Sequence, residues 1–508
     1  MSLLTLVIVV GSWIYISWED RHPGYSVDIQ VKGDGPAGGI RAGFGKMVIT
    51  PTVTDTWNDV NGDAKYNEED GDTFNDINGN GAFDAIWIAG FHNGRPANGI
   101  HDELWARTMV VDDGQTRIAL VILDAVGFMH DDVVDIRKRV SSELGIHYVV
   151  IASTHTHESN DVVGIWGKDE FTSGVDPKEM EYLKSQTVKS IEAAVKAIRP
   201  AKLLFSQDLS GADTAFVKDT RMPLVKAPGV KVLHAIDAET GETLGTVVNW
   251  ANHPETLWSK NLLISADFPH YIREAVEGGV REDTTLLKAG LGGITLYLNG
   301  AIGGLMAPHP SLSVRGPFTD TEYAEPSFEK AKAIGDQIGL LALTSLEKAD
   351  TVESTSISLR AKTITLPLKN TIFRIAGVIG LLNRGGPALF MTRSEVAAFA
   401  IGPATFLSIP GEIYPEILYG GVENPEGRDF ETDPVEVPPI HEFMRGTYDF
   451  YIGLSNDEIG YIIPKSEWDE KEPYLYGKEG GWYGEVNSIG PETGPLIYKE
   501  LVDVLEGI

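Results

Sequence analysis

The chain has 508 residues and no cysteine, which narrows the chemistry available to it. Without thiols it forms neither disulfides nor thiolate zinc sites, so a transition metal would have to be bound by histidine, carboxylate or phenolate groups. Basic residues are also scarce: Lys and Arg total 42 against 73 Asp and Glu, a formal net charge of −31. A field of that sign repels nucleic acids and anionic lipid headgroups, so we expect no nucleic-acid partner.

The sequence has one apolar run at its N-terminus, residues 3–18, which is too short for a comfortable membrane span. Its length suits the core of a signal peptide or an uncleaved anchor, although no Lys or Arg precedes it and no small-x-small cleavage site is obvious. A buried N-terminal strand is the alternative. We expect residues 1–22 to be a signal peptide or membrane anchor, which predicts an extracytoplasmic protein, secreted or attached to a membrane. Residues 23–41 then read as a Gly-rich linker.

The rest of the chain, 42% hydrophobic overall, can bury a large core. Residues 117–124 and 147–153 read as buried strands on either side of an amphipathic helix, 131–144, which together make a βαβ unit. Further strands are predicted over 43–51, 202–206, 230–236, 243–250, 356–366 and 397–408, and further helices over 177–198, 327–348 and 494–505. We therefore predict one α/β domain over residues 42–508, with mixed sheets and flanking helices.

Metal-ligand side chains follow three of the predicted strands. His155 and His157 come directly after one of them, His253 follows another, and Glu412 comes after the apolar stretch 404–409 and a Pro-Gly pair. Ligands in α/β sheets bind at the carboxyl ends of the strands, and imidazole is the commonest metal ligand near neutral pH. The coincidence of three such strand ends predicts a metal site at one edge of a sheet.

These residues belong to a set of segments that resembles the neutral, non-lysosomal ceramidase family from about residue 42 onward. The segments occur in the family's order, at 43–51, 99–107, 154–157, 249–253, 265–269, 409–412 and 460–464. The resemblance implies a single catalytic zinc ion bound by His155, His253, Glu412 and Tyr461. It also implies that His157 shuttles a proton or binds the oxyanion.

Arg221 resembles the family's substrate-binding arginine, although Asp219 stands where Asn is usual. A second departure bears on mechanism, because Met306 occupies the position of a serine once proposed as the family's nucleophile. Met306 cannot attack a carbonyl, so the resemblance points to water activated by the metal, with His157 helping to protonate the leaving amine. The Gly-rich loop 302–308 could still donate backbone N–H groups to the oxyanion.

Two further departures bear on the substrate. The chain ends soon after the last family-like segment, so the immunoglobulin-like C-terminal domain typical of ceramidases is expected to be missing, and the family's stretch after the zinc tyrosine is replaced by 465–474. The apolar segment 372–382 could be a helix at the mouth of a lipid pocket. A buried core helix is the reading that its composition favours.

An acidic insertion, residues 55–84, resembles a pair of calcium-binding loops. Hard oxygen ligands at alternate positions suit calcium, and a loop held by Asx turns is the alternative. The expected calcium ligands are Asp59, Asn61, Asp63 and Asp70 in the first loop and Asp76, Asn78, Asn80 and Asp84 in the second.

Together these observations predict a zinc-dependent hydrolase that cleaves the N-acyl amide bond of ceramide or a related N-acyl lipid, with calcium as a possible structural ion. One alternative is an amidohydrolase that acts on a non-sphingoid amide or ester. An amidohydrolase barrel would also carry His-x-His, but the closely spaced strands over 202–250 argue against eight alternating βα units. The other alternative is a catalytically silent binding homologue.

Overall fold

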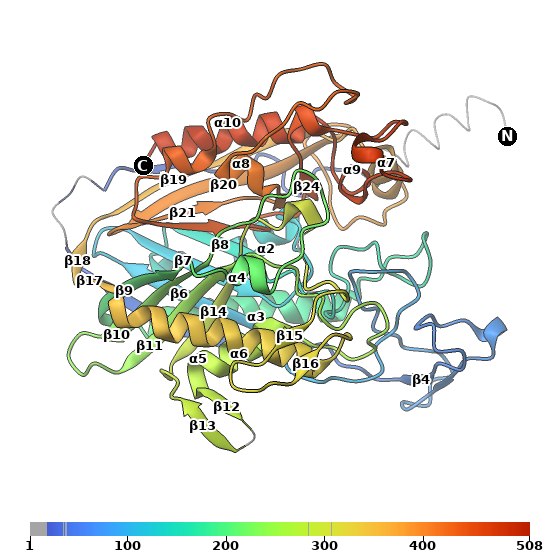
Figure 1. Cartoon of the computed structure of the whole chain (residues 1–508), viewed down its shortest axis with the longest axis horizontal. Coiled ribbons are helices and arrows are strands. Elements are labelled where there is room, and N and C mark those ends of the chain that lie inside the picture. Colours follow the sequence, from blue (N-terminus) through green and yellow to red (C-terminus); the bar gives the residue numbers. More distant parts are fainter. Residues whose placement is uncertain (1–17, 34, 36–37, 283, 306) are drawn as a thin grey trace.

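Two stacked sheets, covered by helices on both outer faces, make up the computed structural model, which describes residues 18–508 except 34, 36, 37, 283 and 306 (Figure 1). In this part of the chain the larger sheet has nine strands, in the order β14-β11-β10-β9-β3-β6-β7-β8, with β17 beside β9. The pairs β7–β8 and β11–β14 are parallel. Its strands are β3 (Arg41–Val48), β6 (Trp105–Asp112), β7 (Arg117–Leu123), β8 (Tyr148–Ser153), β9 (Arg199–Asp208), β10 (Val230–Asp237), β11 (Thr243–Trp250), β14 (Ile294–Asn299) and β17 (Asp350–Val352).

The smaller sheet has the order β1-β19-β20-β21-β23 among the described residues. Its strands are β1 (Asp28–Val31), β19 (Ile357–Pro367), β20 (Met391–Ile401), β21 (Ala404–Ser408) and β23 (Tyr448–Ile452). The pair β21–β23 is parallel, and the other neighbours are antiparallel. Both sheets are therefore part of a mixed α/β architecture, and the predicted fold class is confirmed.

The two sheets bury a shared core between their inner faces. Phe44 and Leu233 reach it from the larger sheet, and Phe399 and Phe406 reach it from the smaller sheet. The rings of Phe399 and Phe406 are stacked with centroids 4.7 Å apart. Because successive strand residues point to opposite faces, the alternate residues of the same strands are free to pack against helices.

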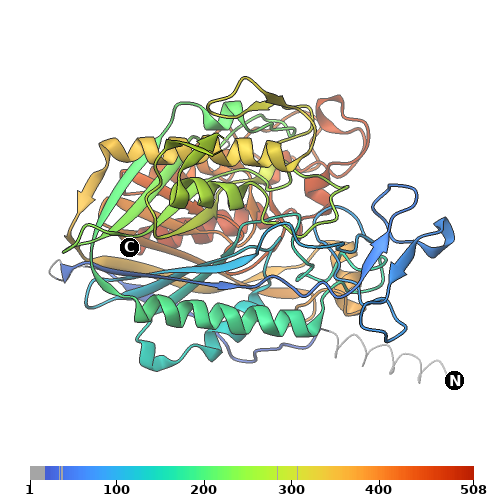
Figure 2. The same cartoon turned by 90° about the horizontal axis from the view of Figure 1, so that it is seen from below.

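Helices cover the outer faces of both sheets (Figures 1 and 2). α2 (His130–Arg139) and α3 (Pro177–Lys196) pack on one half of the larger sheet, α5 (Phe268–Gly278) and α6 (Phe328–Ser345) pack on the other half, and α10 (Thr493–Glu506) covers the smaller sheet. Gly45 of β3 is required by this packing, since a Cβ there would lie 2.5 Å from the carbonyl oxygen of Ser190 in α3. The result is a helix–sheet–sheet–helix arrangement.

Shorter elements complete the chain, and several of them approach the site described below. The helices among them are α4 (Ala212–Ala215), α7 (Thr371–Val378), α8 (Pro415–Tyr419) and α9 (Tyr483–Val486). The paired strands are β2 (Gly38–Gly39) with β18 (Ser354–Thr355), β4 (Thr56–Asn58) with β5 (Thr73–Asn75), β12 (Val280–Glu282) with β13 (Thr285–Lys288), β15 (Val314–Arg315) with β16 (Glu322–Tyr323), and β22 (Glu412–Ile413) with β24 (Tyr461–Ile462). Short 3-10 turns lie at Glu68–Asp70, Ser142–Leu144, Gly303–Leu305, Leu346–Lys348, Ile440–Phe443, Lys465–Glu467 and Leu475–Gly477.

Three expectations about individual elements are corrected. The single strand expected over 397–408 is a hairpin of β20 and β21, because Gly402 turns the chain with a φ of 57°. The helix expected over 131–144 ends at Arg139. The segment 372–382 is not the buried core helix that we favoured: in α7, Ile372 and Ile375 are 60% and 55% exposed, while Phe373 faces a cavity.

The structure bears on only part of what was predicted for the N-terminus, because residues 1–17 lie outside the described residues. From Trp18 onward the chain is built into the domain: Trp18 is buried and donates to the carbonyl oxygen of Ala388, and Asp20 pairs with Arg393 at 2.7 Å. The expected linker 23–41 contains β1, which pairs with β19, so it is part of the smaller sheet. Within the described residues, none of the helices is long and apolar enough to span a membrane.

Candidate metal centre

The loop after β8 carries His155 and His157 in a constrained conformation. His155 has a φ of 70°, a left-handed value that non-glycine residues adopt only where their surroundings enforce it. Its N–H donates to the carbonyl oxygen of Ala125 at 2.9 Å, and the N–H of His157 donates to that of Pro254 at 3.0 Å. These bonds join the loops that follow β7, β8 and β11, so the expected meeting of strand ends takes place.

Glu412 and Tyr461 reach the same point from the smaller sheet's side of the molecule. Glu412 begins β22 and Tyr461 begins β24, and the two residues are direct partners in the register of this parallel pair. The Tyr461 hydroxyl donates a hydrogen bond to the Glu412 carboxylate. A short ladder between two distant segments therefore brings a carboxylate and a phenol together.

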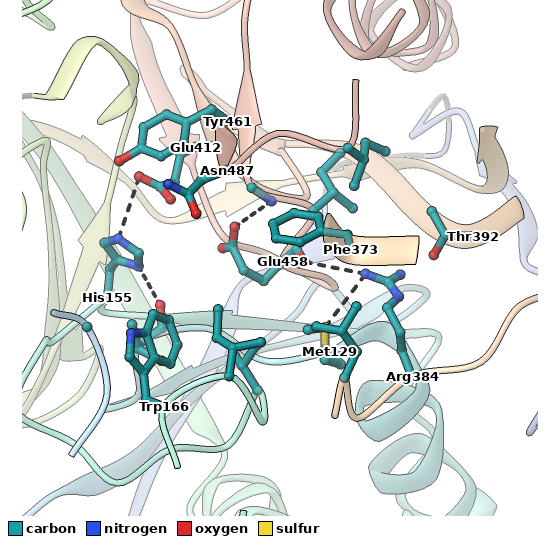
Figure 3. A pocket seen from close by; sticks show the side chains of 18 of the residues that line it. Met129, His155, Trp166, Phe373, Arg384, Thr392, Glu412, Glu458, Tyr461 and Asn487 are labelled. Carbon is teal, nitrogen blue, oxygen red and sulfur yellow. Dashed lines mark hydrogen bonds and ion pairs between the residues drawn. The ribbon is translucent and has the colours of Figure 1, made fainter. Parts of the chain in front are cut away.

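Four donor groups converge on one small volume, and Figure 3 shows three of them, His155, Glu412 and Tyr461. The Glu412 Oε2 atom lies 3.0 Å from His253 Nε2 and 3.6 Å from His155 Nε2. The Nδ1 atom of His155 is hydrogen-bonded to the carbonyl oxygen of Val126, which leaves its Nε2 to face the carboxylate. The structure therefore brings together His155, His253, Glu412 and Tyr461, the four residues that the resemblance implied as zinc ligands.

The protonation states of this group suit a cation. Burial would raise the pKa of Glu412, but its interactions with His155 and His253 and the hydrogen bond from Tyr461 outweigh burial and hold that pKa below its ordinary value. Burial, opposed by Glu412 and assisted by His253, lowers the pKa of His155 to about 4. Neutral imidazoles beside an ionised carboxylate are the form in which these side chains bind zinc. The residues present therefore fit the expected metal.

His157 lies beside this group with a different set of neighbours. Within the described residues, His155, His157 and His253 are the one group of metal-ligand side chains whose donor atoms lie within 4.8 Å of one another. Both ring nitrogens of His157 are buried, and neither has a hydrogen-bond partner in this part of the chain. Its Nδ1 atom lies 3.4 Å from Oε2 of Glu255, whose pKa is raised to about 7 by burial. His157 thus has a nearby carboxyl group with which to exchange a proton.

Two cavities adjoin the histidines: His155 lines the first, His253 lines the second and His157 lines both. The first, about 810 Å³ and partly open to solvent, has mainly apolar walls that include Val126, Ile165, Trp166 and Phe373. The second, about 720 Å³, includes Glu255, Trp258 and His309 in its walls. Gly90, His157, Tyr461 and Tyr483 line both. A molecule bound across the centre would place one part in an apolar space and another in a more polar one.

The family model described as "Neutral/alkaline non-lysosomal ceramidase, N-terminal" matches residues 71–292 of this chain. That segment is therefore similar to the neutral/alkaline ceramidase family. Neutral ceramidase from Pseudomonas aeruginosa has a similar structure, with a TM-score of 0.61 and 17% identity over 92% of this chain and 74% of that chain. A ceramidase solved in complex with C2 is also similar, with a TM-score of 0.61 and 16% identity over 92% of this chain and 75% of that one.

The resemblance seen in the sequence is therefore confirmed, and the similar structures extend the shared fold beyond the matched segment. At 17% and 16% identity these structures establish the fold of the chain. Two stacked sheets also exclude the amidohydrolase barrel considered as an alternative, since its eight strands would close on themselves.

Arg221, the residue expected to bind substrate, lies in a buried ion pair. Its guanidinium pairs with Glu485 at 2.8 Å and lies over the Trp482 ring at 4.3 Å. It also donates to the carbonyl oxygen of Glu467. Among the described residues that line the two cavities, Arg221 is absent, whereas its neighbour Thr220 is present. The substrate-binding role of Arg221 stays a prediction.

The loop that departs from the ceramidase pattern at Met306 is only partly described, since Met306 lies outside the described residues. Ala307 lines the second cavity and pairs with Lys218. Gly303 packs against Tyr414, where a Cβ would lie 2.3 Å from the ring. The expected oxyanion donors of this loop remain a prediction.

The acidic insertion, which contains β4 and β5, projects from the body of the molecule (Figure 1). Its acidic side chains accept from loop N–H groups: Asp59 accepts from Gly62 at 2.7 Å, and Asp76 accepts from Gly79 at 2.7 Å and from Gly81 at 2.8 Å. These are Asx-type turns. In the first loop, Asp72 is buried and accepts from two backbone N–H groups, whereas Asp70 bonds only the Asn67 side chain among the hydrogen bonds described. Calcium binding remains a prediction for both loops.

The sequence reasoning missed several residues of the site. Tyr483 and Asn487 reach the first cavity from α9 and its end, and no motif marked them. Arg95 donates to the carbonyl oxygen of His157 at 2.5 Å and pairs with the buried Glu158. Glu255 stands two residues after His253 in the sequence. This closeness to an expected zinc ligand was the one sequence signal that could have marked Glu255 as part of the site.

Proposed function

We propose that this protein is a zinc-dependent hydrolase that cleaves the N-acyl amide bond of ceramide or a related N-acyl lipid. The observation that carries the proposal is the convergence of His155, His253, Glu412 and Tyr461 between an apolar cavity and a more polar one. The match of residues 71–292 to the ceramidase family model supports an amide as the bond that is cleaved. The apolar walls of the first cavity support a hydrocarbon chain as part of the substrate.

The four converging residues would hold the zinc ion. When bound, zinc supplies Lewis acidity to the acyl carbonyl and to the attacking water. His155 is oriented for this by its hydrogen bond to Val126, and Glu412 is kept ionised by its neighbours. The Tyr461 hydroxyl donates to the Glu412 carboxylate and lines both cavities, so it stands beside the position where the carbonyl would lie.

His157 would move the proton that the reaction transfers. It lines both cavities and lies 3.4 Å from Glu255, so it can take a proton from the attacking water and deliver it to the leaving amine. Glu255 lines only the second of the two cavities. The amine part of the substrate would therefore occupy the second cavity and the acyl chain the first.

The proposal also covers where the protein acts and whether it binds calcium. We propose that the protein acts outside the cytoplasm, secreted or attached to a membrane through its apolar N-terminal run, and that calcium stabilises the insertion 55–84. The exposed Ile372 and Ile375 of α7, beside the cavity wall at Phe373, support contact with a lipid phase.

An amidase for a non-sphingoid amide is the second candidate, because the same centre would cleave any N-acyl bond that reaches it.

The test is release of free fatty acid from a panel of N-acyl amides, ceramide included, followed by mass spectrometry. The purified protein is assayed as isolated, after treatment with a zinc chelator, and after zinc is restored. Release that is lost with the chelator and regained with zinc is expected. Absence of release from every member, with zinc bound, would overturn the proposal in favour of another bond or a binding role.

A further inference from the structure

The apolar first cavity has polar side chains at the end away from the metal centre. In Figure 3, His155 lies at one side of the cavity, Arg384 and Thr392 lie at the other, and Glu458 lies between them. We call Arg384, Thr392 and Glu458 the distal polar cluster; all three line the cavity. If the cavity held only a hydrocarbon chain, these polar side chains would find no hydrogen-bond partner in it. A buried polar group without a partner costs free energy.

The distal polar cluster has hydrogen-bonding capacity that the described residues leave unused. Nε of Arg384 and Oε2 of Glu458 are buried and have no hydrogen-bond partner there. Apart from its ion pair with Asp457, the contacts of Arg384 among the described residues are long: 3.3 Å to the carbonyl oxygen of Arg393, 3.4 Å to that of Glu458 and 3.6 Å to Sδ of Met129. The hydroxyl of the buried Thr392 makes one long bond, 3.4 Å to the carbonyl oxygen of Arg393.

The cluster carries no net charge that would attract an anion. Asp457, fully buried, pairs with Arg384 at 3.0 Å and neutralises it. Glu458 is buried, its Oε1 atom accepts from the N–H of Gly460 at 2.8 Å, and burial raises the pKa of its carboxyl group well above the ordinary value. Neutral donors and acceptors in an apolar wall suit a neutral group that both donates and accepts, which is a hydroxyl.

The part of the substrate that reaches this cluster is the acyl chain, if the proposed function holds. Glu255, which faces His157, lines the second cavity and not the first, so the amine would leave on the second side. The first cavity then takes the chain on the carbonyl side. A hydroxyl at the distal polar cluster would sit along that chain, away from the scissile bond.

We propose that Arg384, Thr392 and Glu458 form a subsite for a hydroxyl group on the acyl chain, so that N-acyl lipids with a hydroxylated acyl chain are preferred substrates. This inference rests on the proposed function and narrows its substrate class. The residues do not act on the reacting atoms. They determine which acyl chains fill the cavity without leaving polar groups unpaired.

The test compares N-acyl amides that differ only by one hydroxyl, moved along an acyl chain of fixed length. For at least one position we expect kcat/KM to exceed that of the plain chain by about tenfold. Thr392→Val and Glu458→Leu should reduce this ratio toward one, whereas Glu458→Gln, which keeps a neutral donor, should retain most of it. Thr295→Val is the matched control, because Thr295 is buried in β14 and absent from the described linings of both cavities.

A binding measurement separates this inference from the proposed function. Calorimetric titration of the zinc-free protein with hydroxylated and plain fatty acids of equal length needs no turnover, and tighter binding of the hydroxylated acid is expected. Equal kcat/KM and equal binding for hydroxylated and plain acyl chains would overturn the proposed hydroxyl subsite without contradicting the proposed amidase activity. A preference that survives in both Thr392→Val and Glu458→Leu would overturn the assignment to these residues.

Discussion

His253 Nε2 lies 3.0 Å from Glu412 Oε2, although the two residues are 159 positions apart in the chain. One residue follows a strand of the larger sheet, and the other begins the β22–β24 ladder. Neither His253 nor Glu412 is exposed by more than 6%. Burying an ionised carboxylate costs free energy unless a cation or a strong donor compensates its charge. We therefore expect a cation to bind between His253 and Glu412.

Replacing His253 or Glu412 by Ala should remove the metal and the activity together. Each change deletes one donor from a set of four, so we expect zinc content to fall to near zero and kcat/KM to fall by about 10³-fold or more. Zinc is measured by plasma mass spectrometry on the dialysed protein. His441→Ala, at an exposed position, is the control and should keep its metal.

Replacing His157 by Gln should separate proton transfer from metal binding. If His157 carries the proton, the variant keeps its zinc and kcat falls by about 10²- to 10⁴-fold. Zinc content and kcat are measured on the same preparation. Loss of the metal in parallel with the activity would instead make His157 a ligand, a role that its closeness to His155 and His253 leaves open.

Gly90→Ala should disturb the centre through His157. Gly90 has a φ of +106°, and a Cβ there would lie 2.5 Å from the Cβ of His157. We expect kcat to fall by about 10²-fold, because a small displacement of a catalytic group is sufficient for that loss. Gly114→Ala is the matched control: its φ is +90° and nothing lies within 4 Å of the added Cβ, so it measures the backbone strain alone. Equal losses in both variants would contradict the argument.

Arg221→Met should act on stability more than on substrate binding. The change leaves Glu485 buried without its partner, at a cost of about 3–5 kcal/mol in the free energy of unfolding. The double variant Arg221→Met/Glu485→Gln should recover much of this loss, and urea unfolding checks both. A large rise in KM in the double variant, with restored stability, would instead show that Arg221 contacts the substrate.

Lys231 should make stability depend on pH in the alkaline range. Burial lowers the pKa of Lys231 to about 8 in the folded protein, against 10.5 for the free side chain. Below pH about 8 both states are charged; between about 8 and 10.5 the unfolded state binds the extra proton, so the fold gains stability as pH rises. The total gain is about 3 kcal/mol relative to Lys231→Met.

The measurement for Lys231 is the difference in unfolding free energy between wild type and Lys231→Met at about pH 7.5 and about pH 10. The wild type should gain on the variant at the higher pH. A difference that stays constant across this range would show that the Lys231 ammonium is solvated in the folded protein.

Much of the fold could be predicted because its strands are continuous apolar runs bounded by turns. The strand 243–250 was predicted with the bounds it has in the structure, and the helices at 177, 327 and 494 were placed within a few residues. The hairpin at Gly402 was missed because both of its arms are apolar. A run of buried residues gives no sign of where it reverses.

The candidate site could be predicted where a residue follows a strand, and not where it depends on contacts between distant segments. His155, His253 and Glu412 come after strands, so their meeting followed from the geometry of sheets. The ion pair of Arg221 could not be predicted, because its partner Glu485 lies 264 positions away in the chain. The distal polar cluster could not be predicted either, since Thr392 and Glu458 come from a strand and a loop that no motif connects.

The register that makes Glu412 and Tyr461 direct partners has an evolutionary consequence. Their separation is set by backbone hydrogen bonds between two-residue strands, and the 48 residues between them do not define it. Within that intervening chain, residues 421–435 include no buried position, so this stretch can lengthen, shorten or change composition while the two side chains keep their positions. Among descendants of this fold, residues 421–435 are where differences in habitat and partners should accumulate while the chemistry is inherited unchanged.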